Sequence, residues 1–241
     1  MPDAIPAEAT QPNRAGALFD AKAAAWPAKY APGGALTGRL TRLSAELRER
    51  AGKGDHVLDL GCATGQLARS AAASGLRVTG CDIAPEMLRL AAAADDGATV
   101  DWVRLAPDWR SLPFPEGTFA AVVASSVLEY TGDVRAVLGE CARVLRPGGI
   151  LLATVPDIRH PVRWAEWLVR PAALGALTLG ADGGRIAGYC TYLRVSGHRH
   201  RTDWWYAAGR RAGLVPVPRP RERASLRLLE FRRPPGQRAI P

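Results

Sequence analysis

The chain has 241 residues, of which 47% are hydrophobic, and it carries a formal net charge of +9. This composition is sufficient to bury one large core, and it excludes a chain that is mainly disordered. The positive charge is uneven, because residues 1–150 hold 16 Lys and Arg against 17 Asp and Glu, whereas residues 151–241 hold 16 against 6.

The N-terminal residues 1–17 contain Pro2, Pro6 and Pro12 and show no apolar period, so we predict a flexible tail there. They lack the pattern of a signal peptide, and no long uncharged apolar run follows, so we expect a cytoplasmic protein without a transmembrane segment. Residues 18–53 predict an N-terminal helical layer, because leucines recur there at helical spacing, at Leu36, Leu40, Leu43 and Leu47.

Residues 54–155 alternate short apolar segments with Ala-rich stretches, which is the pattern of a parallel sheet with crossover helices. Helices are predicted after Gly65, Pro85 and Asp133. The five strands expected here have the continuous apolar character of strands buried on both faces. They are approximately Val57–Leu60, Arg77–Cys81, Thr99–Leu105, Ala120–Ser125 and Ile150–Val155.

Residues 156–200 change the pattern, and we predict a helical insertion there, with its main helical stretch at Val162–Leu179. Residues 201–241 predict a C-terminal helix and hairpin. Thr202 is the expected N-cap of a helix that ends at Gly213. Two β-like runs then follow, at Leu214–Val217 and Ser225–Phe231.

These elements predict a single α/β domain over residues 18–241. Its sheet is expected to be Rossmann-like, doubly wound, mostly parallel and seven-stranded, with an antiparallel C-terminal hairpin strand. The four cysteines are widely separated and form no CxxC pair, so neither a zinc site nor a disulfide framework is indicated.

The strongest local feature is VLDLGCATG, from Val57 to Gly65, where a buried strand runs into a turn of small residues before a helix. Such a turn lets a ligand approach the backbone at the positive end of a helix dipole. The spacing does not fit a dinucleotide fingerprint, because the third glycine position holds Gln66. Asp59, just before the turn, suits a ligand with an ammonium group better than a pyrophosphate.

Asp82 follows the second predicted strand, about twenty residues beyond the glycine turn. A carboxylate at this place can accept hydrogen bonds from both hydroxyls of a ribose. The alternatives are an N-cap role for Asp82 and a solvated strand end for Asp59, but the two acids at this spacing together favour a ligand that contains ribose.

Four segments, VLDLGCATG, CDIAPEML, DWRSLPFPEGTF and RVLRPGG, resemble in order and spacing the motifs of class I S-adenosylmethionine-dependent methyltransferases of the small-molecule type. The resemblance covers roughly Gly54 to Val155. It implies S-adenosyl-L-methionine as the cofactor and a methyl-transfer enzyme as the function.

The resemblance also implies roles for individual residues. The methionine part of the cofactor would contact the first motif, its ribose would bind Asp82, and its sulfonium would lie beside Ser125 at the end of strand four. The full set of cofactor residues that we expect is Tyr30, Asp59, Gly61, Ala63, Thr64, Gly65, Asp82, Ile83, Met87, Asp108, Trp109 and Ser125. Ile83 and Met87 would flank the adenine, the carboxylate of Asp108 would meet its amino group, and Trp109 would offer its backbone N–H.

Three positions depart from the family pattern. The Asp that usually follows the LPFPEGTF segment is replaced by Ala120. The middle glycine of the first motif is Ala63, and Glu129 stands where a histidine is usual at the end of strand four. If the acceptor atom is a hydroxyl oxygen, a base must lie within hydrogen-bond reach of it. His160, just past strand five, and Glu129 are the candidate catalytic residues, with capping or ion-pairing roles as their alternatives.

A small-molecule acceptor is favoured, with oxygen as the leading target atom, because strand four lacks the Asn/Asp-Pro-Pro-aromatic tetrapeptide used on base amines or glutamine amides. The insertion could supply an aromatic wall from Trp164, Trp167, Tyr189 and Tyr192. Arg194, Arg199 and Arg201 could bind an anionic group of the acceptor, or could simply face solvent.

Two other functions remain open at this point. The aromatic and basic residues from Tyr189 to Tyr206 could serve an RNA methyltransferase, although a separate RNA-binding module is absent from the sequence. The Trp- and Leu-rich insertion beside basic residues could instead contact a membrane surface and receive a lipid-linked acceptor.

Overall fold

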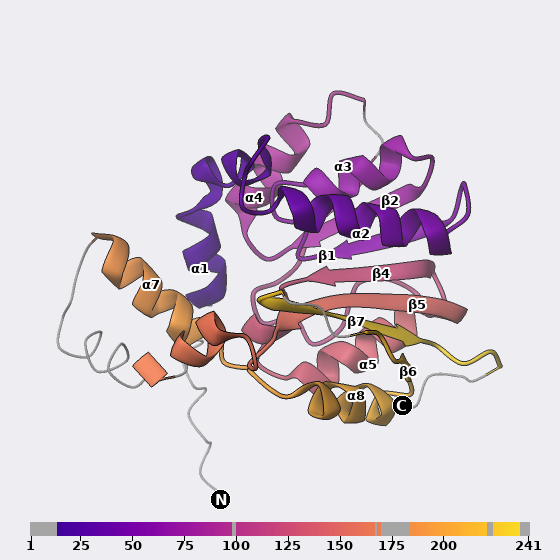
Figure 1. The fold of residues 1–241 in the computed structure, drawn as a ribbon. Coiled ribbons are helices and arrows are strands. Elements are labelled where there is room, and N and C mark those ends of the chain that lie inside the picture. The colour runs from indigo at the N-terminus through magenta and orange to yellow at the C-terminus, as the bar shows by residue number, and fades with distance from the viewer. Residues whose placement is uncertain (1–13, 98–99, 167, 170–183, 221–223, 237–241) are drawn as a thin grey trace, which may run out of the picture.

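A seven-stranded sheet forms the centre of the protein in the computed structural model, which describes residues 14–97, 100–166, 168–169, 184–220 and 224–236. The strands lie in the order β3-β2-β1-β4-β5-β7-β6 (Figure 1). Their bounds are β1 His56–Leu60, β2 Arg77–Asp82, β3 Val100–Arg104, β4 Phe119–Ser125, β5 Leu145–Pro156, β6 Val215–Val217 and β7 Leu226–Arg232.

The five strands that the sequence predicts pair in parallel, and β7 pairs antiparallel with both β5 and β6. The predicted mostly parallel sheet with an antiparallel C-terminal hairpin strand is therefore confirmed. The strand order reverses between β1 and β4, which are neighbours in the sheet. The carboxyl ends of strands beside such a reversal are where open α/β sheets bind ligands.

Helices cover both faces of the sheet. On one face lie α2 Thr37–Arg50 and α3 Gln66–Ala73, and on the other lie α5 Val134–Val144 and α8 Thr202–Arg211 (Figure 1). Successive residues of β4 divide between the two cores, because Val122 packs toward α5 and α8 while Val123 packs toward α2 and α3. This two-sided burial explains why the strands read as continuous apolar runs.

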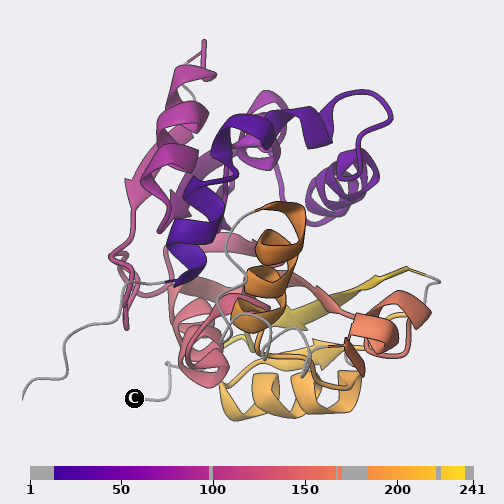
Figure 2. The same ribbon diagram turned by 90° about the vertical axis from the view of Figure 1, so that its left-hand side faces the viewer.

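The remaining helices lie around the carboxyl ends of the strands or flank the sheet. They are α1 Arg14–Asp20, η1 Ala23–Ala25, η2 Pro27–Tyr30, α4 Pro85–Ala93, η3 Leu128–Tyr130 and α7 Gly184–Val195. Figure 2 shows α1 and α7 side by side, although they come from opposite parts of the chain, and the two helices are in contact.

The N-terminal boundary differs from the predicted one. Residues 14–17, which the sequence analysis assigns to a flexible tail, belong to α1, where Ala15 and Gly16 are buried. A Cβ on Gly16 would lie 3.7 Å from the side chain of Ile83, which is ordinary van der Waals contact, so α1 packs close to Ile83 at this point. Small residues thus give this segment a packing surface that an apolar-period search does not detect. Residues 1–13 lie outside the described part.

The ends of the C-terminal helix also differ from the predicted ones. Its N-cap is Arg201, not Thr202, and no side chain caps it. The helix ends at Arg211 rather than at Gly213. Of the predicted helical stretch Val162–Leu179, residues 161–166 and 168–169 are helical, and the rest lies outside the described residues. No helix within the described ranges is both long enough and apolar enough to cross a membrane.

Candidate active site

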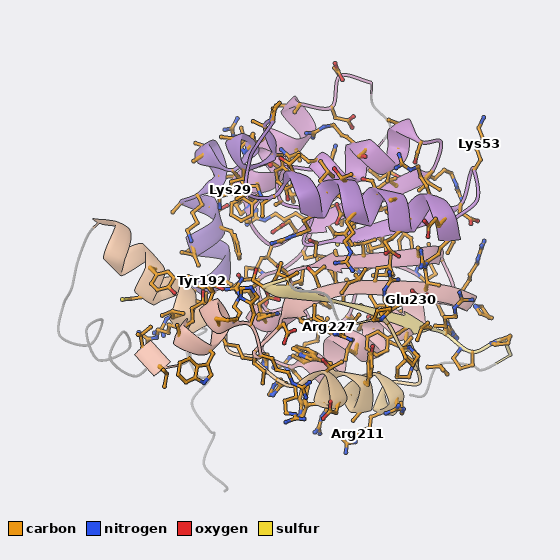
Figure 3. The ribbon with its side chains drawn as sticks, in the orientation of Figure 1. Lys29, Lys53, Tyr192, Arg211, Arg227 and Glu230 are labelled. Atoms are coloured by element: carbon orange, nitrogen blue, oxygen red, sulfur yellow. The ribbon has the colours of Figure 1, made fainter. Side chains whose placement is uncertain are left out.

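A cavity of about 1120 Å³ opens at the carboxyl ends of β1, β2 and β4. Residues of α1, of the segment from η1 to the start of α2, and of α7 also line it. Figure 3 shows Lys29 of η2 and Tyr192 of α7, which both line the cavity, at this end of the sheet. Ten predicted cofactor residues line it: Tyr30, Asp59, Gly61, Ala63, Asp82, Ile83, Met87, Asp108, Trp109 and Ser125.

The small-residue turn after β1 is fixed by two left-handed backbone positions. Gly61 has φ 72°, and a Cβ there would come within 2.4 Å of the Val127 side chain, so only glycine fits. Ala63 has φ 48°, a conformation that is unfavourable for an L-residue. The Ala63 N–H donates to the Asp82 carboxylate at 2.8 Å, which helps to hold the turn in this shape.

Two residues of the predicted cofactor set, Thr64 and Gly65, do not line the cavity. Thr64 is buried, and its hydroxyl donates to the Gln66 side chain at 2.7 Å. Gly65 has φ 78° and starts α3, and a Cβ there would lie 2.4 Å from the Trp102 ring. These residues therefore shape the turn and the packing of α3 against β3 rather than the ligand surface.

Asp59 is buried at the cavity, with 3% of its surface exposed, and its Oδ2 atom has no hydrogen-bond partner. Burial and, to a smaller extent, the neighbouring charge of Asp82 together raise the pKa of this carboxyl to about 7. An unpaired buried carboxylate oxygen is costly unless a donor binds it. The site is therefore suited to a cationic group, as expected from the sequence.

Asp82 is oriented by backbone amides. Its Oδ2 accepts from Ala63 N–H, and its Oδ1 accepts from Ala84 N–H at 2.9 Å. Burial raises the pKa of Asp82, whereas these N–H groups lower it. Each carboxylate oxygen has further lone pairs for a second donor, so the arrangement leaves Asp82 able to accept hydroxyl groups from a ligand.

The side of the cavity expected to hold adenine differs in one detail from the sequence prediction. Met87 is fully buried, Ile83 is partly buried, and Asp108 is exposed at the rim. The Trp109 N–H already donates to the Ala106 carbonyl at 3.1 Å, so it is not free for a ligand. The sequence analysis expected this N–H to contact the adenine. That expectation is wrong, because the loop folds as a turn and the Trp109 ring packs on the core.

Glu129 is the candidate catalytic residue that lines the cavity. It lies in η3, just after β4, with 2% of its surface exposed, and its Oε2 atom has no partner. Burial raises the pKa of Glu129 to about 7, although the charges of Arg39 and Arg163 lower it. A carboxyl with a pKa near neutrality is suited to accept a proton.

His160 is not among the residues that line the cavity. Its backbone carbonyl accepts the N–H groups of Arg163 and Trp164, so it caps the short helix that begins after it. His160 thus holds the N-cap position through its backbone, whereas its buried Nδ1 atom has no hydrogen-bond partner among the described residues. Of the two candidate bases, Glu129 lines the cavity and His160 does not.

The sequence analysis missed two arginines that line the cavity, Arg39 and Arg163. A signal for Arg39 was present, because it lies three residues after Leu36 and four before Leu43, on the apolar face of its helix. The three arginines that were expected to bind an anion do not line the cavity. Arg199 pairs with Glu166 at 2.5 Å, Arg201 pairs with Asp203, and Arg194 is exposed.

Three tyrosines form an aromatic wall beside these arginines. The Tyr130 and Tyr192 rings lie 6.4 Å apart, and Tyr192 stacks on Tyr189 with 5.9 Å between ring centroids. Tyr189 and Tyr192 were expected here, whereas Trp164 is 57% exposed and does not line the cavity. Trp167 lies outside the described residues.

A family model described as a methyltransferase domain matches residues 58–153. Among curated proteins, the ubiquinone biosynthesis O-methyltransferase of Xanthomonas axonopodis pv. citri is 31% identical over 169 residues, which are 69% of this chain and 62% of that protein. The demethylmenaquinone methyltransferase of Tropheryma whipplei is 37% identical over 112 residues, 46% of this chain and 45% of that protein. The matched part of the chain thus spans less than two thirds of the length of each of these relatives.

Solved structures support the fold. An S-adenosylmethionine-dependent methyltransferase from Mesorhizobium loti has a TM-score of 0.62 and 21% identity, over 84% of this chain and 99% of that one. A Haloferax volcanii protein solved in complex with a methyltransferase activator has a TM-score of 0.65 and 23% identity, over 90% and 97%. Residues 58–153 therefore match a methyltransferase domain, and the chain shares the fold of solved S-adenosylmethionine-dependent methyltransferases.

Proposed function

We propose that the protein transfers a methyl group from S-adenosylmethionine to a hydroxyl oxygen of a small-molecule acceptor. The observation that carries this proposal is the composition of the single cavity described above. Its strand-end side holds two acids, the buried Asp59 and the partly buried Asp82, and its other side holds a buried carboxyl, Glu129, among tyrosines. One side fits the cofactor, and the other fits an acceptor that loses a proton.

The residues present fit the cofactor. The ammonium group of its methionine part would supply the donor that Asp59 Oδ2 lacks. Asp82, already held by two backbone amides, would accept the ribose hydroxyls. Ile83 and Met87 offer apolar surface for adenine. The absence of side-chain bulk at Gly61 lets the ligand approach the turn.

When bound, S-adenosylmethionine supplies a methyl group on a positively charged sulfur. The new oxygen–carbon bond forms as the carbon–sulfur bond breaks, so the protein gains rate by holding the acceptor oxygen in line and excluding water. Glu129 would take the hydroxyl proton, because it is buried at the cavity and has an unpaired oxygen. α1 and α7 would keep water out.

The relatives make a small-molecule acceptor the favoured class, since their names refer to ubiquinone biosynthesis and demethylmenaquinone. A lipid-linked acceptor at a membrane surface is the second candidate. Exposed apolar side chains on the segment after His160 favour it, namely Val162, Trp164, Leu168 and Val169. Flotation with anionic liposomes tests this second candidate, and a protein that stays unbound would remove it.

A two-part experiment tests the proposal. Calorimetry should show that S-adenosylhomocysteine binds with micromolar-order affinity and that Asp82→Asn weakens this binding about tenfold or more. Incubation with methyl-labelled cofactor and separate pools of phenols, hydroxy acids, sugars, quinols and total RNA should then label a hydroxyl compound. Absence of cofactor binding by folded protein would refute the proposal, and labelling of RNA alone would replace the acceptor class.

A further inference from the structure

The loop between β3 and β4, residues 105–118, forms the wall of the cavity where adenine is expected. Two leucines, Leu105 and Leu112, each have 3% of their surface exposed and belong to the same core cluster. Most of the residues between them are exposed, and those that line the cavity are Pro107, Asp108, Trp109 and Arg110. The adenine wall is therefore a short exposed turn between two buried ends.

The first end of this turn is held at the ribose side of the site. The Leu105 N–H donates to the backbone carbonyl of Asp82 at 2.9 Å, and the Asp82 carboxylate is the group proposed to bind the ribose. Within the turn, the Trp109 N–H donates to the Ala106 carbonyl at 3.1 Å. Asp108 lies inside this hydrogen-bonded turn, so its place depends on how both ends of the loop are fixed.

The second end is held by two charged residues of α5, Glu140 and Arg143. The Leu112 N–H donates to the Glu140 carboxylate at 2.6 Å. The Arg143 guanidinium donates to the carbonyls of Leu112 at 3.0 Å and of Phe114 at 2.8 Å. It also makes two hydrogen bonds of 2.8 Å to Glu140, one to each carboxylate oxygen. A bidentate pair of this kind fixes geometry as well as charge.

This ion pair is shielded from solvent better than a surface pair. The side chains of Glu140 and Arg143 are 15% and 27% exposed. Burial raises the pKa of Glu140, but the Arg143 guanidinium and the Leu112 N–H lower it below its ordinary value, so the carboxyl stays charged at neutral pH. Neither side chain lines the cavity. Any effect of the pair on a ligand must therefore pass through the loop that it holds.

We propose that Glu140 and Arg143 are positioning residues for the cofactor, and that they hold the Asp108 carboxylate at the 6-amino group of adenine. A carboxylate accepts a hydrogen bond from an amino group and repels a carbonyl oxygen, so a fixed Asp108 selects a 6-aminopurine over a 6-oxopurine. Asp108 is exposed at the rim, where a contact from a freely moving side chain contributes little. The two ends of the loop supply the fixed position. This inference rests on the proposed function, because it takes S-adenosylmethionine as the cofactor.

The first arm of the test compares two ligands that differ at the purine alone. S-adenosylhomocysteine carries the 6-amino group, and S-inosylhomocysteine carries a carbonyl oxygen in its place. Calorimetry with the full chain should show that S-adenosylhomocysteine binds about tenfold or more tightly than S-inosylhomocysteine. Equal affinities would overturn the inference and leave the proposed function intact. If S-adenosylhomocysteine does not bind the folded protein, the proposed function fails and the inference fails with it.

The second arm releases the loop. Arg143→Met should bring the ratio of the two affinities to within about threefold of one, and Arg143→Lys should restore part of the preference. Arg146→Met is the matched control and should keep the ratio. Arg146 also makes two hydrogen bonds to one carboxylate, that of Asp55, but it is 51% exposed and does not line the cavity. If Arg143→Met weakens both ligands by the same factor, the pair is only structural and the inference is overturned.

The third arm tests whether the pair acts through Asp108. Asp108→Ala should by itself lower the ratio, and adding Arg143→Met to it should change the ratio by less than about twofold. An undiminished preference in Asp108→Ala would show that the loop does not recognise the purine, and would refute the inference.

Thermal melting verifies that each variant is folded. If Arg143→Met is unfolded, Glu140→Gln takes its place, because the amide oxygen can still accept the Leu112 N–H while the charge that binds Arg143 is lost. The ratio of the two affinities should then fall as well. An unchanged ratio in folded Glu140→Gln would count against the inference in the same way.

Discussion

Glu129 determines the expected dependence of the reaction on pH. Because its pKa is raised to about 7, it is protonated below that pH and free to accept a proton above it. The rate at saturating substrate should therefore rise between about pH 6 and pH 8. Glu129→Gln should abolish this rise and lower kcat by about 10²- to 10⁴-fold, with cofactor binding unchanged.

His160→Ala is the control for this prediction. It changes the other candidate base, which caps a helix away from the cavity lining. The variant should keep the rise in rate with pH and most of the rate itself. A pH profile that is lost in His160→Ala and kept in Glu129→Gln would assign the proton to His160.

The deprotonated carboxyl of Asp59 should lower the free energy of unfolding of the ligand-free protein at neutral and higher pH. Its pKa is about 7 in the folded protein, against an ordinary value of 3.8, so between these values the folded state binds the extra proton. Stability from this group is present below pH 4 and is lost as the pH rises to about 7. At pH 8 the loss amounts to up to about 4 kcal/mol.

Asp59→Asn removes this loss. In urea unfolding of the ligand-free protein, the variant should be more stable than the unsubstituted protein at pH 8, and the difference should shrink toward pH 4. The same variant should bind S-adenosylhomocysteine more weakly, because the ammonium group loses its carboxylate. Equal stability of the two proteins at pH 8 would show that Asp59 is solvated or paired in solution.

The sequence predicted the acids of the site better than its cations. Asp59 lies near the end of one predicted strand and Asp82 follows the next. The carboxyl ends of parallel strands meet at one edge of the sheet, so the proximity of the two acids follows from the topology alone. Arg39 lies in α2 and Arg163 lies in the insertion, and both line the cavity. No local sequence pattern predicts how these two elements are placed relative to the sheet. Trp109 shows the same limit, because its N–H is used by a turn inside its own loop.

At the scale of elements, a buried ion-pair network joins α2 to the C-terminal hairpin. Glu230 of β7 has 3% of its surface exposed and pairs with Arg219 at 2.7 Å and with Arg50 at 3.3 Å. Arg219 also pairs with Glu46 of α2. Breaking one member of such a network leaves an uncompensated buried charge.

Glu230→Gln should therefore lower the free energy of unfolding by about 3 kcal/mol, measured by urea titration. The matched control is Glu49→Gln, which removes a carboxylate that is 71% exposed and pairs with the same Arg50. The control should change stability by less than about 1 kcal/mol. Equal effects of the two substitutions would mean that the buried network contributes no more to the free energy of unfolding than an exposed ion pair does.

Element identity was predictable because the central strands are buried on both faces, as β4 shows with six buried residues out of seven. Element ends were less predictable. The start of α8 at Thr202 has no side-chain cap, so the capping pattern pointed to the wrong residue. α1 was missed at its start because Ala15 and Gly16 pack by being small, which an apolar-period search does not detect.

At the scale of the whole molecule, the two halves of the chain meet over the cavity. The Phe19 ring of α1 lies against Trp26 and against Tyr130, at 5.6 and 5.1 Å. The Asp20 carboxylate accepts the Glu86 N–H at the start of α4, at 3.0 Å. α7 contacts α1 from the other side (Figure 2). α1 and α7 therefore form part of the wall of the cavity.

Ligand binding should stabilise this closure, because a ligand in the cavity contacts α1, η2 and α7 together, and contacts made only in the closed state shift the equilibrium toward it. Hydrogen exchange with and without S-adenosylhomocysteine should show slower exchange in residues 14–40 and 184–195. The exchange of α8, which contributes no residue to the cavity lining, should not change and serves as the internal control. Protection confined to the turn after β1 would mean that the helices close independently of the ligand.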